Sequence, residues 1–309
     1  MGNNNTEKIH HHDTSHILQS LAVNLLITVL KAIAAFMTAS GAMLAETIHS
    51  FADCSNQALL YMGVKQAQRP PDQKHPLGYG RAVYFWSFMV AMLLFSIGGM
   101  FSIYEGIHKL QHPEPVQHLM WAVGVLIFSI LLEGYAMFSN ILEMNKRRRK
   151  TRFFRYLQET KDSDLVVIFG ENTAAVIGLF VALIAVIASW YTGDGRYDAV
   201  GSLIIGFVLI AVAIFLAIEV KSLLIGESAD PHISNTAAKI ALAHPNIKKM
   251  LECITIQQGP GEVMACVKIS CSPDLNSIDV SNLINDFERQ LRQECPELRW
   301  LFVEPGLMR

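Results

Sequence analysis

Long apolar runs dominate the pattern of this chain. Six of them lie at 17–38, 42–65, 82–104, 117–137, 165–191 and 199–220. A helix needs about 20 residues to cross the hydrocarbon core of a bilayer, and each run is near or above that length. Within each run the apolar residues occupy all faces of a helix rather than one stripe, which favours burial in lipid or in a bundle. The pattern therefore predicts an all-α membrane domain of six transmembrane helices.

After the last apolar run, the pattern changes to the mixed periodicities of a soluble domain. Two segments with strand-like alternation flank a Gly-Pro-Gly turn, and helical spacing precedes and follows them. The expected elements are a helix at 233–242, strands at 253–257 and 263–271, a helix capped by Asn276 and a strand at 298–303. This αββαβ order predicts a small α+β domain with helices over one face of a three-stranded sheet.

Composition supports a membrane protein and excludes other classes. Hydrophobic residues make up 51% of the chain and charged residues only 17%, whereas soluble domains carry roughly 25% charged residues. A net charge of −2 provides no basic field to attract nucleic acid, so no nucleic-acid partner is expected. Five cysteines in 309 residues do not form a disulfide scaffold. The expected surroundings are a lipid bilayer and, for the appendage, water.

The distribution of Lys and Arg predicts the orientation in the membrane. Basic residues gather in the connections after the second and fourth runs, and the opposite connections contain few. By the positive-inside rule both termini are cytoplasmic, and a bacterial inner membrane is the expected location. The expected domains are a His-rich N-terminal tail at 1–16, a transport domain at 17–227 and a cytoplasmic C-terminal domain at 228–309.

Two of the apolar runs contain polar residues that point to a metal. The second contains Glu46, His49, Asp53 and Asn56 on one helix face, and the fifth contains Glu171 and Asn172. Each ionisable group in mid-membrane costs about 2.5–3.5 kcal/mol unless it is paired or ligated. An imidazole with a carboxylate suits Zn²⁺ or another divalent ion, and two ligands from each helix would complete a four-coordinate site. Hydrogen bonding between helices is the alternative explanation for either cluster alone.

Three segments resemble one known family, the cation diffusion facilitators. The segment from Glu46 to Gln57 is similar to that family's second helix, with its His/Asp-x-x-x-Asp pair. The segment from Asp72 to Arg81 resembles the family's His-Pro-x-Gly-x-Gly-Arg loop. Glu171, followed by Asn-Thr-Ala-Ala, resembles the zinc transporter 9 branch. Most members have His-x-x-x-Asp on the fifth helix. If Glu171 takes the Asp position here, Val167 takes the His position. The fourth ligand would then be Asn172, Glu46 or water.

The resemblance covers nearly the whole chain and implies a secondary transporter rather than an enzyme. It implies efflux of divalent metal, Zn²⁺ first, in exchange for protons through a site between the second and fifth helices. It also implies a homodimer and a ferredoxin-like, metallochaperone-like C-terminal domain. A ligand set poor in imidazole is harder, so Mn²⁺, Fe²⁺ and Co²⁺ are alternative substrates. The alternatives outside this class are an intramembrane metallohydrolase, whose His-Glu-x-x-His spacing is absent, and a metal-sensing receptor.

The resemblance also suggests further metal ligands outside the membrane. Asp72 and His75 resemble a loop site of some family members, although Tyr79 stands where those members can have a third ligand. In the C-terminal domain, His232, His244 and Glu304 lie where the family can bind regulatory metal between protomers.

One basic residue lies inside the first apolar run. Lys31 can either pair with Glu46 or extend its ammonium toward the membrane surface. The second arrangement is the expected one, because long basic side chains commonly reach out of the hydrocarbon.

Overall fold

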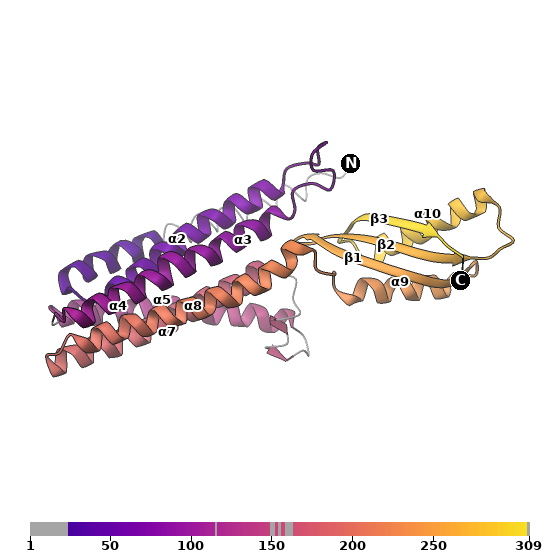
Figure 1. Cartoon of the computed structure of the whole chain (residues 1–309). Helices are drawn as coiled ribbons and strands as arrows, with labels where there is room; N and C mark the ends of the chain where they lie inside the picture. The colour runs from indigo at the N-terminus through magenta and orange to yellow at the C-terminus, as the bar shows by residue number, and fades with distance from the viewer. Residues whose placement is uncertain (1–23, 115, 149–151, 154–155, 158–162, 308–309) are drawn as a thin grey trace. The chain divides into compact units, whose positions relative to one another are not determined.

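The computed structural model describes residues 24–114, 116–148, 152–153, 156–157 and 163–307 (Figure 1). The His-rich tail expected at 1–16 and the beginning of the first expected span lie outside these residues. The described chain falls into two compact units, one helical and one that contains a sheet. Each unit is described by itself.

The helical unit is built from long apolar helices. They are Asn24–Thr38, α2 (Gly41–Ala67), α3 (Ala82–Leu93), the π-helical η1 (Leu94–Met100), α4 (Phe101–Gln111), α5 (Leu119–Arg147), α7 (Ser163–Thr192) and α8 (Arg196–Ile225). Because α3, η1 and α4 follow without a break, they form one rod of 30 residues (Figure 1).

Four helical segments of the described chain are long and apolar enough to span a bilayer: Ala82–Gln111, Leu119–Lys146, Val166–Thr192 and Arg196–Ile225. Two further helices lie at the remaining two expected spans. The described part of the first, Asn24–Thr38, is shorter, and α2 has 27 residues but contains the polar stripe. The chain is therefore an integral membrane protein, and all six expected spans coincide with helix in the part that is described.

Small residues let η1 and α8 approach each other closely. A Cβ atom placed on Gly206 of α8 would lie 2.9 Å from the carbonyl oxygen of Gly99 in η1. Backbone therefore touches backbone at this point, which is a packing mode typical of membrane helices. The contact leaves no room for a side chain at either glycine.

The N-terminus of α2 is capped by a buried carboxylate from α8. Asp198 accepts hydrogen bonds from the Ser40 hydroxyl at 2.6 Å and from the Gly41 backbone N–H at 2.5 Å. The Ser40 hydroxyl in turn accepts from the N–H of Met43 at 3.1 Å. These bonds satisfy free N–H groups at the positive end of the helix dipole. The polar helix α2 is thus tied at its first turn to α8.

The second unit contains the expected αββαβ fold. Its elements are α9 (Pro231–Ala243), β1 (Ile247–Gly259), β2 (Glu262–Cys271), α10 (Ser277–Glu294) and β3 (Leu298–Pro305). The strands lie in the order β1-β2-β3, with β1 antiparallel and β3 parallel to the central β2. The prediction of a small α+β domain is confirmed.

Alternate residues of β2 form the floor of the core in this unit. The side chains of Val263, Ala265, Val267 and Ile269 are buried together with Ile233 of α9 and Phe287 of α10. Both helices therefore cover the same face of the sheet. Side chains that alternate with these lie on the other face, where Ile254 and Phe302 are 51% and 56% exposed.

Truncating the large core residue of α10 should weaken this unit selectively. Phe287→Ala removes a fully buried ring, and such changes cost about 3–5 kcal/mol. The matched variant Ile278→Ala changes a residue of the same helix that is 70% exposed, where substitutions stay within about 0.5 kcal/mol. Hydrogen exchange of β2 in the full chain should accelerate strongly for the first variant only. Equal exchange in the two variants would contradict this core.

Candidate metal centre in the membrane domain

The buried face of α2 is unusually polar for a membrane helix. Glu46, His49 and Asn56 are fully buried, while the side chain of Asp53 is 18% exposed. Their spacing of three to four residues places them on one face of the helix. A face of this kind must be turned toward protein or water rather than lipid, because unpaired polar groups are costly in hydrocarbon.

His49 and Asp53 face each other without a hydrogen bond. The distance from His49 Nε2 to Asp53 Oδ2 is 3.6 Å, which is beyond hydrogen-bond range. Both ring nitrogens of His49 and the Oδ1 atom of Asp53 are buried with no hydrogen-bond partner among the described residues. Burial of such atoms costs roughly 1–3 kcal/mol each. A divalent cation between the imidazole and the carboxylate would bind one ring nitrogen of His49 and the carboxylate of Asp53.

The helix α7 contributes a carboxylate at the same level. The Nδ2 atom of Asn56 donates a hydrogen bond to Glu171 Oε1 at 2.7 Å, and the carboxyl groups of Asp53 and Glu171 are close enough to interact electrostatically. The amide oxygen of Asn56 is buried and has no partner among the described residues. The structure therefore brings His49 and Asp53 together with Asn56 and Glu171.

The sequence also drew attention to two other residues of α7, Asn172 and Val167. Asn172 follows Glu171 with a partly exposed side chain, and the amide that contacts Glu171 is that of Asn56 on α2. Val167, one turn before Glu171, is fully buried. No second imidazole is therefore placed beside Glu171 at that turn of the helix.

Lys31 does not extend toward the membrane surface, and that expectation was wrong. Its side chain is fully buried, and its Nζ atom donates to Glu133 Oε1 at 2.8 Å, to Ser50 Oγ at 2.8 Å and to Glu46 Oε2 at 3.3 Å. Three acceptors replace the water that the ammonium loses, so the buried position becomes tolerable.

Glu133 on α5 is a partner of Lys31 that the sequence reasoning overlooked. It is the one acidic residue of the apolar span expected at 117–137, and this isolation was the available signal. Its Oε1 atom is bonded to Lys31, and its Oε2 atom is buried with no partner among the described residues. Lys31 thus links the first helix, α2 and α5.

The candidate ligand Glu46 belongs to this lysine network. One of its oxygens is bonded to Lys31, and the other has no partner among the described residues. A Cβ atom on Gly178 of α7 would collide with that second oxygen, so the glycine makes room for the carboxylate. Four carboxylates and one ammonium share this region: Glu46, Asp53, Glu133, Glu171 and Lys31. When these carboxyl groups are ionised, their charge exceeds that of the ammonium, and this favours a cation.

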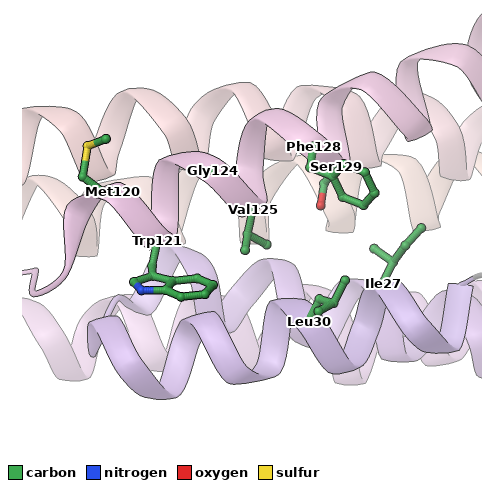
Figure 2. Close-up of a pocket in the computed structure, with 8 residues that line it drawn as sticks. All are labelled: Ile27, Leu30, Met120, Trp121, Gly124, Val125, Phe128 and Ser129. Carbon is green, nitrogen blue, oxygen red and sulfur yellow. The ribbon is translucent and has the colours of Figure 1, made fainter.

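A cavity of about 340 Å³ lies elsewhere in the unit, between the first helix and α5. Figure 2 shows Trp121 and Val125 of α5 pointing toward the helix that carries Leu30. Its lining is apolar apart from Ser129. With no imidazole or carboxylate among its lining residues, this groove is not the metal centre.

The loop residues Asp72 and His75 form a hydrogen-bonded turn with Tyr79. Asp72 Oδ2 accepts from the Tyr79 hydroxyl at 2.7 Å, and Oδ1 accepts from the His75 N–H at 2.6 Å. The Tyr79 hydroxyl and then the His75 N–H lower the pKa of Asp72, and the same contact with Asp72 raises the pKa of Tyr79. Both Asp72 and His75 are about half exposed. These bonds already account for the shape of the loop.

The three tail residues suggested by the family do not meet within one chain. His232 and His244 lie at opposite ends of α9, and His244 Nδ1 accepts from the Asn246 N–H at 3.3 Å. Glu304 pairs with Lys268 at 2.8 Å on the surface. His232 instead lies beside Cys295 and Glu297.

Membrane-spanning helices that enclose imidazole and carboxylate groups, joined to a small α+β domain, define a class of integral membrane proteins with an internal polar site. Residues 17–225 match the family described as the cation efflux transmembrane domain, and the chain belongs to this family.

Two named relatives match most of this chain. The mouse "Proton-coupled zinc antiporter SLC30A9, mitochondrial" is 31% identical over 92% of this chain, and Arabidopsis thaliana "Metal tolerance protein C4" is 30% identical over 81%. The chain spans about half the length of these relatives, 50% and 55% respectively.

Two magnetosome proteins are more distant matches. MamB of Paramagnetospirillum magneticum is 25% identical over 93% of this chain and 92% of its own. A solved nickel form of a MamM C-terminal domain variant is 10% identical and covers 26% of this chain and 100% of that one. Its TM-score of 0.24 is too low to support any conclusion.

Removing the buried ammonium should destabilise the helical unit. Lys31→Met leaves Glu46 and Glu133 without their cation, and breaking a buried ion pair typically costs about 3–5 kcal/mol. The matched variant Lys221→Met removes an exposed lysine of α8, which should change stability by less than about 0.5 kcal/mol. Thermal unfolding of the detergent-solubilised chain compares them. A Lys31→Met protein that melts with the wild type would contradict the network.

The Asp72 turn should respond to acid in a defined direction. Because the pKa of Asp72 is lowered, its ionised form stabilises the turn above the ordinary Asp range, and this contribution is lost as the pH falls through the lowered pKa. Tyr79→Phe removes the main hydrogen bond and should raise the pKa of Asp72, as followed by carbon-13 NMR of labelled aspartate. Tyr135→Phe, at an exposed position on α5, is the control. An unchanged titration in Tyr79→Phe would refute the assignment.

Proposed function

We propose that this chain is a secondary transporter that exports a divalent metal cation, with Zn²⁺ as the first choice, in exchange for protons. The observation that carries the proposal is the buried His49–Asp53 pair, whose ring nitrogens and carboxylate oxygen have no hydrogen-bond partner among the described residues. It lies at the level where α2 contacts α7 through Asn56 and Glu171.

The ligand set that we propose contains one nitrogen and several oxygens. His49 supplies a neutral imidazole, Asp53 and Glu171 supply carboxylates, and Asn56 supplies an amide oxygen. Asn172 and the second oxygen of Glu46 are further donors near these positions. Lys31 acts as a fixed cation that holds Glu46 and Glu133, so the carboxylates at Asp53 and Glu171 attract the cargo.

Two arguments bear on the identity of the metal, and they favour different ions. The mouse relative is named as a zinc antiporter, which favours Zn²⁺. An oxygen-rich set with a single imidazole is harder than the usual zinc site and suits Mn²⁺, Fe²⁺ or Co²⁺ as well. Zn²⁺ is therefore the first substrate to test, with Mn²⁺ as its competitor.

Exchange with protons follows from the chemistry of the ligands. Metal binding needs a neutral imidazole and ionised carboxylates, so protons and metal compete for the same atoms. A proton gradient can therefore drive release of the metal on the more acidic side.

The basic connections favour a cytoplasmic side for both termini, and we propose that the metal leaves the cytoplasm. A bacterial inner membrane remains the proposed location, although the mouse relative is named as mitochondrial. We also propose a homodimer, because the uncovered sheet face of the tail exposes Ile254 and Phe302 and large apolar side chains that cluster on a surface favour association.

Transport by reconstituted protein tests the function and the site together. In proteoliposomes with a pH gradient, the wild type should take up Zn²⁺ with opposite proton movement. His49→Gln, Asp53→Asn and Glu171→Gln should each reduce uptake by at least about 100-fold, since even partners of metal ligands are worth 10–100-fold. Ser55→Ala changes an exposed hydroxyl on the same helix and is the matched control.

Each outcome has a separate meaning in this assay. Wild-type uptake by Asp53→Asn would refute the site, and zinc flux that ignores the pH gradient would refute proton exchange. Mn²⁺ flux in the absence of Zn²⁺ flux would support the transport function and identify Mn²⁺ rather than Zn²⁺ as the substrate. A wild type that moves no divalent metal would refute the function.

A further inference from the structure

Three side chains of metal-binding types lie close together in the C-terminal unit, and none of them belongs to the proposed transport site. The ligand atoms of His232, Cys295 and Glu297 all lie within 4.8 Å of one another. We propose that these residues bind a divalent metal ion of the zinc class within one copy of the chain. The inference is independent of the proposed transport function, because all three residues belong to the sheet-containing unit.

Two of the ligands stand on a tightly held turn between α10 and β3. The Cys295 N–H donates to the Leu291 carbonyl at 2.9 Å, and the Leu298 N–H donates to the Cys295 carbonyl at 3.1 Å. The Glu297 carbonyl accepts from the Val263 N–H of β2 at 2.9 Å. The backbone that carries Cys295 and Glu297 is therefore fixed by the helix before it and by the sheet beside it.

The third ligand comes from the first turn of α9. The carboxylate of Asp230 caps this helix by accepting from the His232 N–H at 2.7 Å. Four residues further along the same face, the hydroxyl of Thr236 hydrogen-bonds to the Cys295 thiol. Two neighbouring turns of α9 therefore face the sulfur, and His232 lies on the more exposed of the two.

The donor atoms suit a borderline metal ion. Thiolate, imidazole and carboxylate are ligands of Zn²⁺, with bond lengths of about 2.0–2.3 Å. In a tetrahedron of this size the ligand atoms are about 3.5 Å apart, so small side-chain rotations would close the site. Hard ions such as Mg²⁺ and Ca²⁺ prefer sites made of oxygen alone.

The burial of the three side chains is graded in a way that fits metal entry. Cys295 is buried, Glu297 is partly exposed and His232 is exposed. The sulfur therefore forms the floor, and a water molecule can occupy the fourth position on the open side. A bound ion would clip the start of α9 to the turn before β3, two segments that are about 60 residues apart in sequence.

Cobalt spectroscopy on the full-length protein tests the site, because thiolate bound to Co²⁺ gives a charge-transfer absorption. Measurements use the Asp53→Asn background, so that loss of transport does not affect the result. One equivalent of Co²⁺ should produce the band, and Zn²⁺ should abolish it. Cys295→Ser should remove the band. Cys266→Ser, which removes another tail thiol, should keep it.

The exposed ligand gives a variant that should fold normally. His232→Ala should weaken Co²⁺ binding by at least about 10–100-fold, whereas His244→Ala, at the far end of α9, should leave binding unchanged. Glu297→Gln should weaken it, and Glu294→Gln in the last turn of α10 should not. Zn²⁺ should also slow hydrogen exchange in the turn from Cys295 to Leu298, and His232→Ala should abolish that protection.

Three results would overturn the proposal. They are the absence of a thiolate band in the Asp53→Asn protein with an unchanged tail, a band that survives Cys295→Ser, and binding that is unaffected by His232→Ala. Because the background variant already lacks the proposed transport ligand, failure of this site leaves the transport proposal untouched, and failure of transport leaves this site untouched.

Discussion

The cost of keeping charged side chains away from water organizes the helical unit. The ammonium of Lys31 is enclosed by Glu46, Glu133 and Ser50, and these partners come from two other helices. Removal of Lys31 would leave two carboxylates without their cation. The same constraint separates the polar residues into two groups. Lys31 binds one oxygen of Glu46 and one of Glu133, whereas neither ring nitrogen of His49 has a partner in the described chain.

This separation suits the proposed transport site, which would bind a metal ion and release it. A network in which every hydrogen bond is made is rigid, whereas buried polar atoms without a partner gain free energy when a ligand binds them. The Asn56–Glu171 bond joins α2 to α7 beside the unsatisfied pair. In the tail, by contrast, a thiol and a carboxylate stand on a turn fixed by backbone hydrogen bonds, beside an imidazole at the start of α9, and this arrangement suits the proposed ion that stays in place.

Much of the fold could be read from local patterns, and part of the site could not. The four-residue spacing of His49 and Asp53 placed both on one helix face, because a helix turn has 3.6 residues. The alternation in β1 and β2 and the helix cap at Asn276 predicted elements of the C-terminal domain. The position of Lys31 was predicted wrongly, because a single span carries no information about a carboxylate 102 residues away. The cluster at His232 was not predicted for a similar reason, since Cys295 lies 63 residues further along the sequence.

The sequence by itself determined the apolar spans, the polar stripe on α2 and the αββαβ order of the tail, because each depends on the periodicity of neighbouring residues. Tertiary structure alone decided which polar faces meet. It paired Asn56 with Glu171, 115 residues apart, turned Lys31 inward and carried Cys295 to the start of α9. These contacts depend on how whole helices pack and on where buried charges find partners, which no local pattern encodes.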